Sequence, residues 1–166
     1  IAPSRGNSST EDYSNAVGYG EAKHVATGPQ LGDKRTPEAS LPTGTAVIST
    51  GDEDGITFAG MQPGATGSLT ADVRNVGTAG AQLDAWIDFD GNNSFEATEQ
   101  VLKSQSVAVS GKVSFNVAVP ANAKSGDWVA RVRLSQPADG TLGPTGSAAT
   151  GEVEDYSVSS ANLTFD

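Results

Sequence analysis

The chain has 166 residues with 20 acidic and 10 basic side chains, a formal net charge of −10, and no cysteine. This length supports one sizeable core, whereas the missing cysteines exclude disulfides, thiolate metal sites and a cysteine nucleophile. The acidic balance argues against nucleic acid and anionic membrane as partners. No apolar run approaches the ~20 residues of a membrane span, so we expect no membrane insertion.

Residues 1–43 show little strand patterning and are interrupted by many glycines and prolines. We predict an N-terminal arm of ordered loops that packs on the body of the protein from about Asp12 onward. The only histidine, His24, lies in this arm, and we expect it to be a packed or capping residue. The opening Ile1-Ala2-Pro3 lacks a methionine, as a processed export product or an excised fragment would.

From Thr45 onward, short β segments alternate with turn signals, at the spacing that is typical of a sandwich. The first predicted strand is Thr45–Ser49. Apolar and polar residues alternate cleanly over 67–74, 113–119 and 128–134, as in antiparallel strands that cover a core. We therefore predict an all-β, antiparallel β-sandwich of immunoglobulin-like or jelly-roll-like type, with about seven to nine strands. Its predicted range is 44–160, followed by a C-terminal tail over 161–166.

One loop has the spacing of a calcium site. It begins directly after an aromatic and β-branched segment, and its oxygen-bearing side chains stand at loop positions 1, 3, 5, 7 and 12: Asp88, Asp90, Asn92, Ser94 and Glu99. An EF-hand uses these positions for its ligands, with a bidentate glutamate at position 12. The alternation of a strand places Asp88 and Asp90 on one side of the sheet end. We predict that these five residues bind Ca²⁺; the alternative is a solvated acidic hairpin.

A second acidic group is formed by Asp52, Asp54, Glu152, Glu154 and Asp155. These carboxylates would repel one another unless a cation, an arginine or hydrogen bonds intervened. A second metal site is one interpretation. We favour the other, in which Glu154 and Asp155 pair with Arg131 and Arg133 and accept hydrogen bonds from backbone amides.

Enzymatic function has little support in the sequence, because no nucleophile elbow accompanies His24 and no phosphate loop or dinucleotide fingerprint is present. Trp86 shares its predicted face with Asp84 and Asp88, so it is the candidate contact for a glycan in a carbohydrate-binding module. A third possibility is mechanical: an arm that begins with Ile1, Ala2 and Pro3 adds a strand to an open sheet edge of a second copy.

Several motifs in order resemble the GEVED domain family. They include Asp12 to Ala16, Gly51-Asp52-Glu53-Asp54-Gly55, Ala85 to Gly91, Ala130 to Ser135 and the closing Gly151-Glu152-Val153-Glu154-Asp155, and the resemblance covers roughly residues 11–160. It implies a β-sandwich module of secreted and surface proteins of bacteria and archaea, often repeated in adhesins. The family often has an Asp-Phe-Asn-Gly-Asp-Gly loop where this chain has Asp88-Phe89-Asp90-Gly91-Asn92-Asn93.

Taken together, these features predict a non-enzymatic, calcium-stabilised structural module that is secreted and lies at the cell surface. Its expected partners are copies of itself or neighbouring modules of a surface fibre, as an adhesin module or filament subunit. The alternative function is a carbohydrate-binding module with glycan partners.

Overall fold

The computed structural model describes residues 11–14, 16, 18–33 and 55–159. Within these ranges the chain forms eleven strands and two short 3-10 helices. The strands are β1 (Glu11–Tyr13), β2 (Ala22–Val25), β3 (Gln30–Leu31), β4 (Ile56–Ala59), β5 (Thr66–Arg74), β6 (Ala81–Ile87), β7 (Gln100–Val107), β8 (Gly111–Ala118), β9 (Asp127–Ser135), β10 (Gly146–Ala148) and β11 (Glu152–Ser159). The helices are η1 (Ala97–Glu99) and η2 (Pro137–Asp139).

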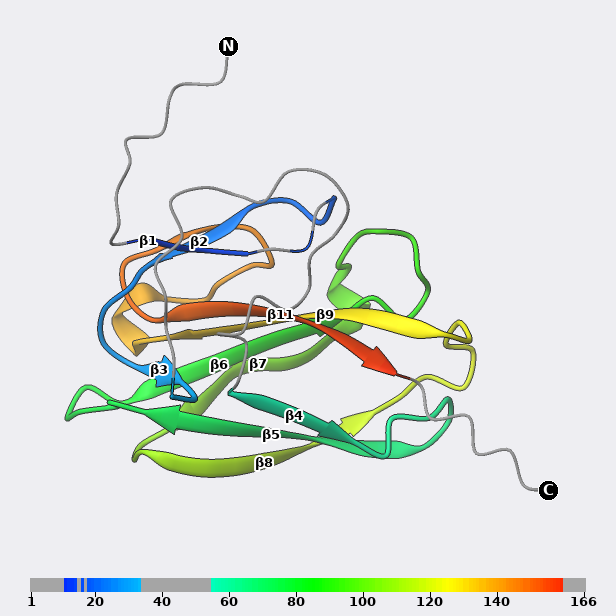
Figure 1. Cartoon of the computed structure of the whole chain (residues 1–166), viewed down its shortest axis with the longest axis horizontal. Helices are drawn as coiled ribbons and strands as arrows, with labels where there is room; N and C mark the ends of the chain where they lie inside the picture. The colour runs from blue at the N-terminus through cyan, green and yellow to red at the C-terminus, as the bar shows by residue number, and fades with distance from the viewer. Residues whose placement is uncertain (1–10, 15, 17, 34–54, 160–166) are drawn as a thin grey trace, which may run out of the picture.

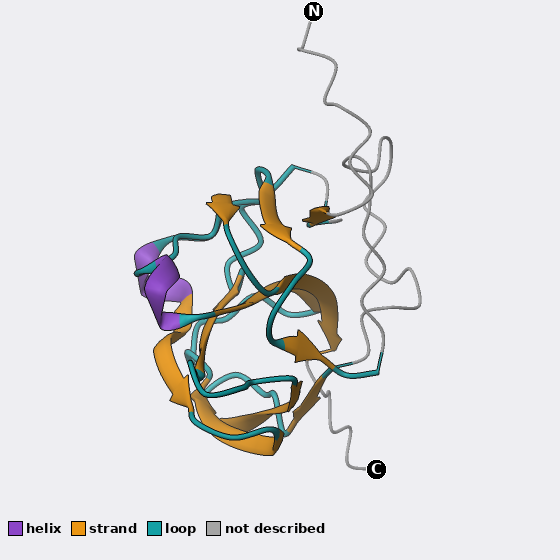
Figure 2. Cartoon of the chain, turned by 90° about the vertical axis from the view of Figure 1, so that its left-hand side faces the viewer, coloured by secondary structure: helices purple, strands orange, loops and turns teal. Residues whose placement is uncertain are grey.

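The body is a sandwich of two sheets. The central sheet has the strand order β11-β9-β6-β7, and all its pairings are antiparallel. In the second sheet, hereafter the lower sheet, β3 and β4 pair with β5, which also pairs with β8. Figure 1 shows the lower sheet beneath the central one, and Figure 2 shows the strands curving around a common interior when the sandwich is seen end-on. The predicted all-β sandwich is confirmed.

Strand alternation fills the space between these two sheets with apolar side chains, because every second residue points inward. Strand β9 contributes four such residues, and β5 and β6 contribute three each: Trp128, Ala130, Val132, Leu134, Leu69, Ala71, Val73, Leu83, Ala85 and Ile87. Each of these side chains is at most 2% exposed. This cluster is the hydrophobic core on which the loops at the ends of the sandwich rest.

A third, smaller sheet lies on the outer face of the central sheet (Figure 1). Here β2 pairs antiparallel with β1 and parallel with β10, and we call this unit the covering sheet. It explains why all seven residues of β6 are buried, although a sandwich strand with one wet face would alternate. Part of the segment predicted as an arm of loops therefore forms strands, which are too short to show a period in the sequence.

A buried polar layer separates the covering sheet from the central sheet. Arg133 on β9 is fully buried and donates to the carbonyl oxygens of Gly143 (2.8 Å) and Gly146 (2.9 Å). Its Nε donates to His24 Nε2 at 3.0 Å, so the ring hydrogen of His24 is on Nδ1, which contacts Thr150 O at 2.6 Å. Burial, followed by the neighbouring charge of Arg131, lowers the pKa of Arg133 to about 10. His24 is thus a packed residue, as predicted.

Candidate metal centre

The candidate metal loop, from Asp88 to Glu99, connects β6 to β7 and wraps around the carboxylate of Asp88. Asp88 is 1% exposed and stands directly after β6, where its N–H continues the pairing with β9 by donating to Val129 O at 2.9 Å. Its Oδ1 accepts from the N–H groups of Gly91 (2.9 Å) and Asn92 (3.2 Å), and its Oδ2 accepts from Asn93 N–H (3.0 Å). These bonds coil the backbone around the Asp88 side chain.

Glu99 joins the end of the loop to its beginning. This residue closes η1, immediately before β7. Its Oε2 accepts from Phe89 N–H at 2.7 Å and Asp90 N–H at 3.3 Å, while Oε1 accepts from Glu96 N–H at 3.2 Å. These hydrogen bonds tie the residue just before β7 back to the start of the loop.

Three of the predicted ligands come together. One carboxylate oxygen from each of Asp88, Asp90 and Glu99 lies within 4.8 Å of the other two. Ca²⁺ binds oxygen at about 2.3–2.6 Å, so two of its ligands stand at most about 5 Å apart. The spacing and the all-oxygen donor set therefore fit a calcium ion. In the same loop, Glu96 Oε2 is buried and has no hydrogen-bond partner among the described residues.

The crowding of these carboxyl groups changes their acidity. Burial raises the pKa of Glu99 to about 7, and its contact with Glu96 adds to the shift. The pKa of Asp90 is raised first by a hydrogen bond with the Asp88 carboxyl and then by desolvation. Hydrogen bonds from Glu99 and Asn92 lower the pKa of Glu96. Neighbouring acids that cannot all ionise easily are the surroundings in which a bound cation has the greatest effect.

The other two predicted ligands, Asn92 and Ser94, make hydrogen bonds within the loop. Asn92 Oδ1 accepts from Ser94 N–H at 3.0 Å, and its amide nitrogen donates to Glu96. The Ser94 side chain also hydrogen-bonds to Glu96. Glu96 itself was missed, although it stands at position 9 of the loop, from which an EF-hand often reaches its ion through a water molecule.

The turn survives without a glycine at position 6. Asn93 occupies that position with φ 63°, in the left-handed region that an EF-hand glycine supplies, and Gly91 has φ 68°. Asparagine tolerates this conformation better than most residues because its short polar side chain bonds locally. The loop thus bends as the consensus requires.

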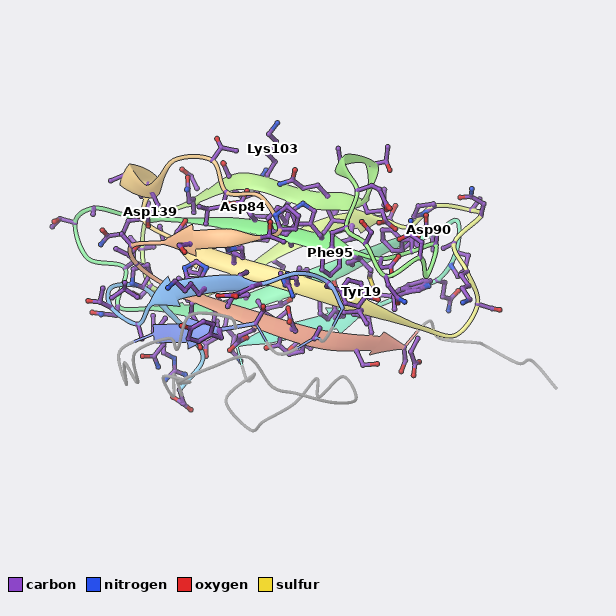
Figure 3. All side chains as sticks on the ribbon, turned by 90° about the horizontal axis from the view of Figure 1, so that it is seen from above. Tyr19, Asp84, Asp90, Phe95, Lys103 and Asp139 are labelled. Atoms are coloured by element: carbon purple, nitrogen blue, oxygen red, sulfur yellow. The ribbon has the colours of Figure 1, made fainter. Side chains whose placement is uncertain are left out.

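A cavity of about 320 Å³ adjoins the cluster and gives it a route to solvent. Its walls include Asp90 and Glu99, with Thr98 and Asn122 as further polar groups, and Phe89, Pro120 and Ala123 as apolar ones. Figure 3 shows Asp90 at the end of the molecule, near Tyr19 and Phe95. The spacing within the loop could not reveal Tyr19, whose hydroxyl donates to Asp88 Oδ2 at 2.8 Å across 69 positions of the chain.

The second acidic group is largely engaged with the backbone. Glu152 accepts from Leu31 N–H (2.7 Å), Glu154 from Gly55 N–H (3.3 Å), and Asp155 from Ala16 N–H (2.8 Å). Asp155 also pairs with Arg131 at 2.9 Å. The Asp155 contacts and the backbone bond to Glu154 agree with the favoured interpretation, whereas Arg133 donates to His24 and to carbonyl oxygens. Asp52 and Asp54 lie outside the described residues, as do the predicted strand Thr45–Ser49 and the segment Ile1–Pro3.

Trp86, the candidate glycan contact, is 2% exposed, although the sequence assigned its face of β6 to solvent. A sugar would need an accessible ring face for stacking. Among the described residues, no helix is both long and apolar enough to cross a membrane.

Comparison with known protein families gives a match over the second half of the chain. Residues 82–159, from β6 to the end of β11, match the GEVED domain. The quoted motifs before residue 82 lie outside this range. No curated protein and no solved structure gave a significant match. The matched segment contains both the candidate metal loop and the Gly151 to Asp155 motif. Residues 82–159 of this chain therefore belong to the GEVED domain family.

Proposed function

We propose that the chain is a non-enzymatic structural module of an extracellular or cell-surface protein, stabilised by calcium. The observation that carries this proposal is the convergence of Asp88, Asp90 and Glu99, whose oxygens lie within 4.8 Å of one another. An ion held there joins the start of the loop at β6 to its end at β7. It acts as a brace at one end of the sandwich, because both strands belong to the central sheet.

The test is a thermal melt in 10 mM calcium and in chelator. Extracellular calcium modules bind at about 10⁻⁴ to 10⁻³ M, and a ligand at 100 times its dissociation constant adds about 2.7 kcal/mol. For a domain of this size, that corresponds to a rise in melting temperature of roughly 5 °C or more. Magnesium at the same concentration should give a smaller rise, since it demands octahedral geometry and keeps its waters.

Asp90→Asn is the informative variant, because Asp90 is exposed and, among the described residues, its side chain accepts one backbone hydrogen bond, from Asn92 at 3.2 Å. This variant should fold and lose most of the calcium-dependent shift. Asp33→Asn is the matched control, since Asp33 is an exposed acid that pairs with Arg74 on the lower sheet. An unchanged melting temperature of the unmodified protein in calcium would rule the proposal out.

A second proposal concerns assembly with further copies. Among the described strands, β4 and β11 lie at the edges of their sheets, and between them runs a groove of about 380 Å³. Its walls include Ile56, Phe58, Met61 and Val158, and the Phe58 and Tyr156 rings meet edge-on at 5.9 Å. We propose that this groove receives an extended segment of a second copy, the N-terminal residues 1–10, by strand addition.

The assembly proposal is tested by light scattering in calcium. Full-length protein should form oligomers, whereas protein that lacks residues 1–10 should remain monomeric with an unchanged melting temperature. A full-length protein that is monomeric at high concentration contradicts strand addition without affecting the calcium proposal. The alternative function, carbohydrate binding, is not supported by Trp86, because its ring is buried.

A further inference from the structure

Tyr19 connects two parts of the molecule that are far apart in the sequence. It precedes β2 of the covering sheet, yet its hydroxyl donates to Asp88 Oδ2 at 2.8 Å and lies 3.4 Å from Asn93 Oδ1. Its ring packs on Phe95 of the same loop, with 4.7 Å between the ring centroids (Figure 3). The Tyr19 side chain is therefore held by the metal loop at both its polar and its apolar parts.

Arg131 holds the backbone of this segment in the same place. Its Nη1 donates to Gly20 O at 3.1 Å and to Pro144 O at 2.8 Å, and its guanidinium lies 5.3 Å from the centre of the Phe95 ring. Asp155, which pairs with Arg131, also accepts from Ala16 N–H. Ala16, Tyr19 and Gly20 are thus positioned by fully buried charged groups of the central sheet, so Tyr19 meets Asp88 in a defined orientation.

Each oxygen of the Asp88 carboxylate accepts two hydrogen bonds. Its Oδ2 accepts from both Tyr19 and Asn93, while Oδ1 accepts from Gly91 and Asn92. Donors of this kind fix the orientation of a ligating carboxylate, and the loss of one typically lowers metal affinity about 10- to 100-fold. Tyr19 is a side-chain donor to Asp88 that comes from outside the loop.

We propose that Tyr19 is a positioning residue for the metal loop, and that calcium binding is thereby coupled to the docking of the covering sheet on the central sheet. This inference rests on the calcium site of the proposed function. Coupling between two sites is reciprocal. An ion that fixes Asp88 strengthens the attachment of the segment that contains Tyr19, and a well-docked segment strengthens ion binding.

The test compares Tyr19→Phe with the unmodified protein, because phenylalanine keeps the packing on Phe95 and removes only the hydroxyl. Calcium titration calorimetry should give about tenfold weaker binding for the variant. Hydrogen exchange should show that calcium protects the amides around Tyr13 to Val25 in the unmodified protein and protects them much less in the variant. Tyr13→Phe is the control: Tyr13 is a buried tyrosine of the same sheet, and its variant should bind calcium with unchanged affinity.

The outcomes separate the two proposals. If calcium binds and stabilises the protein but Tyr19→Phe leaves both the affinity and the exchange protection unchanged, only the coupling is wrong. A variant that is less stable to the same extent with and without calcium also contradicts the coupling, since Tyr19 is then merely a packing residue. If the unmodified protein binds no calcium, the metal site fails and the coupling fails with it.

Discussion

Arg131 and Asp155 lie directly opposite each other on β9 and β11 and form an ion pair of 2.9 Å, with no part of either side chain exposed. The pair sits in the buried polar layer beneath the covering sheet. There Asp155 also accepts from Ala16 N–H, and Arg131 donates to backbone carbonyl oxygens at Gly20 and Pro144. This pair therefore connects the three-stranded covering sheet to the sandwich.

Asp155→Ala should destabilise the protein by about 3–5 kcal/mol, because it leaves a buried guanidinium without its counter-charge. Urea unfolding followed by circular dichroism measures the loss. Asp72→Ala is the control, since Asp72 pairs with the half-exposed Arg74 on the lower sheet and such pairs contribute at most about 1 kcal/mol. Equal effects of the two substitutions would contradict the structural role of the buried pair.

Gly151→Ala should be strongly destabilising, by about 3 kcal/mol or more. Gly151 has φ 90°, and a Cβ atom there would lie 1.8 Å from Leu134 O, a backbone atom of the central sheet. Gly143→Ala is the control, since the nearest atom to a Cβ at that position is 4.0 Å away. Urea unfolding of the two variants measures the difference. If Gly151→Ala left the stability unchanged, β9 and β11 would have to be further apart than the structure indicates.

Trp86→Ala should lower stability by about 3–5 kcal/mol, the typical cost of truncating a buried aromatic side chain. Val109→Ala, at a side chain that is 75% exposed, should change stability by no more than about 0.5 kcal/mol. If Trp86→Ala instead kept the melting temperature and removed binding to a glycan array, the ring would have to be accessible, and the carbohydrate-binding alternative would regain its support.

The buried carboxyl of Asp84 predicts a pH effect. Its pKa is raised, chiefly because it is desolvated, while the Ser104 N–H bond and the charge of Arg133 oppose the shift. A raised pKa in the folded state means that protonation favours folding. Its stabilising contribution is present below the unfolded pKa of about 3.9 and is lost as the pH rises through the folded value.

Asp84→Asn removes this titration while keeping an oxygen to accept from Ser104 N–H, which is 2.9 Å from Asp84 Oδ1. The unfolding free energy of the unmodified protein minus that of the variant should fall between pH 4 and pH 7, as measured by urea titrations at several pH values. A difference that is flat or that rises with pH would show that the shift has the opposite sign.

The sequence by itself determined the fold class, the GEVED family motifs and the carboxylates of the candidate metal loop. Side chains of a strand point to alternate faces, so a strand with one face on the core and one in water shows alternating apolar and polar residues in its sequence. This alternation is present over 67–74, 113–119 and 128–134. The loop positions of Asp88, Asp90 and Glu99 are likewise local, so their spacing alone indicated their convergence.

Only the tertiary structure decided what lies on the outer face of the central sheet. The covering sheet joins residues near the start of the chain to β10, and its three- to four-residue strands are too short to leave a period. On that outer face Trp86 and Asp84 are buried, and Tyr19 reaches Asp88, a contact between residues 69 positions apart. Such contacts depend on how separate segments pack, and no spacing within either segment encodes them.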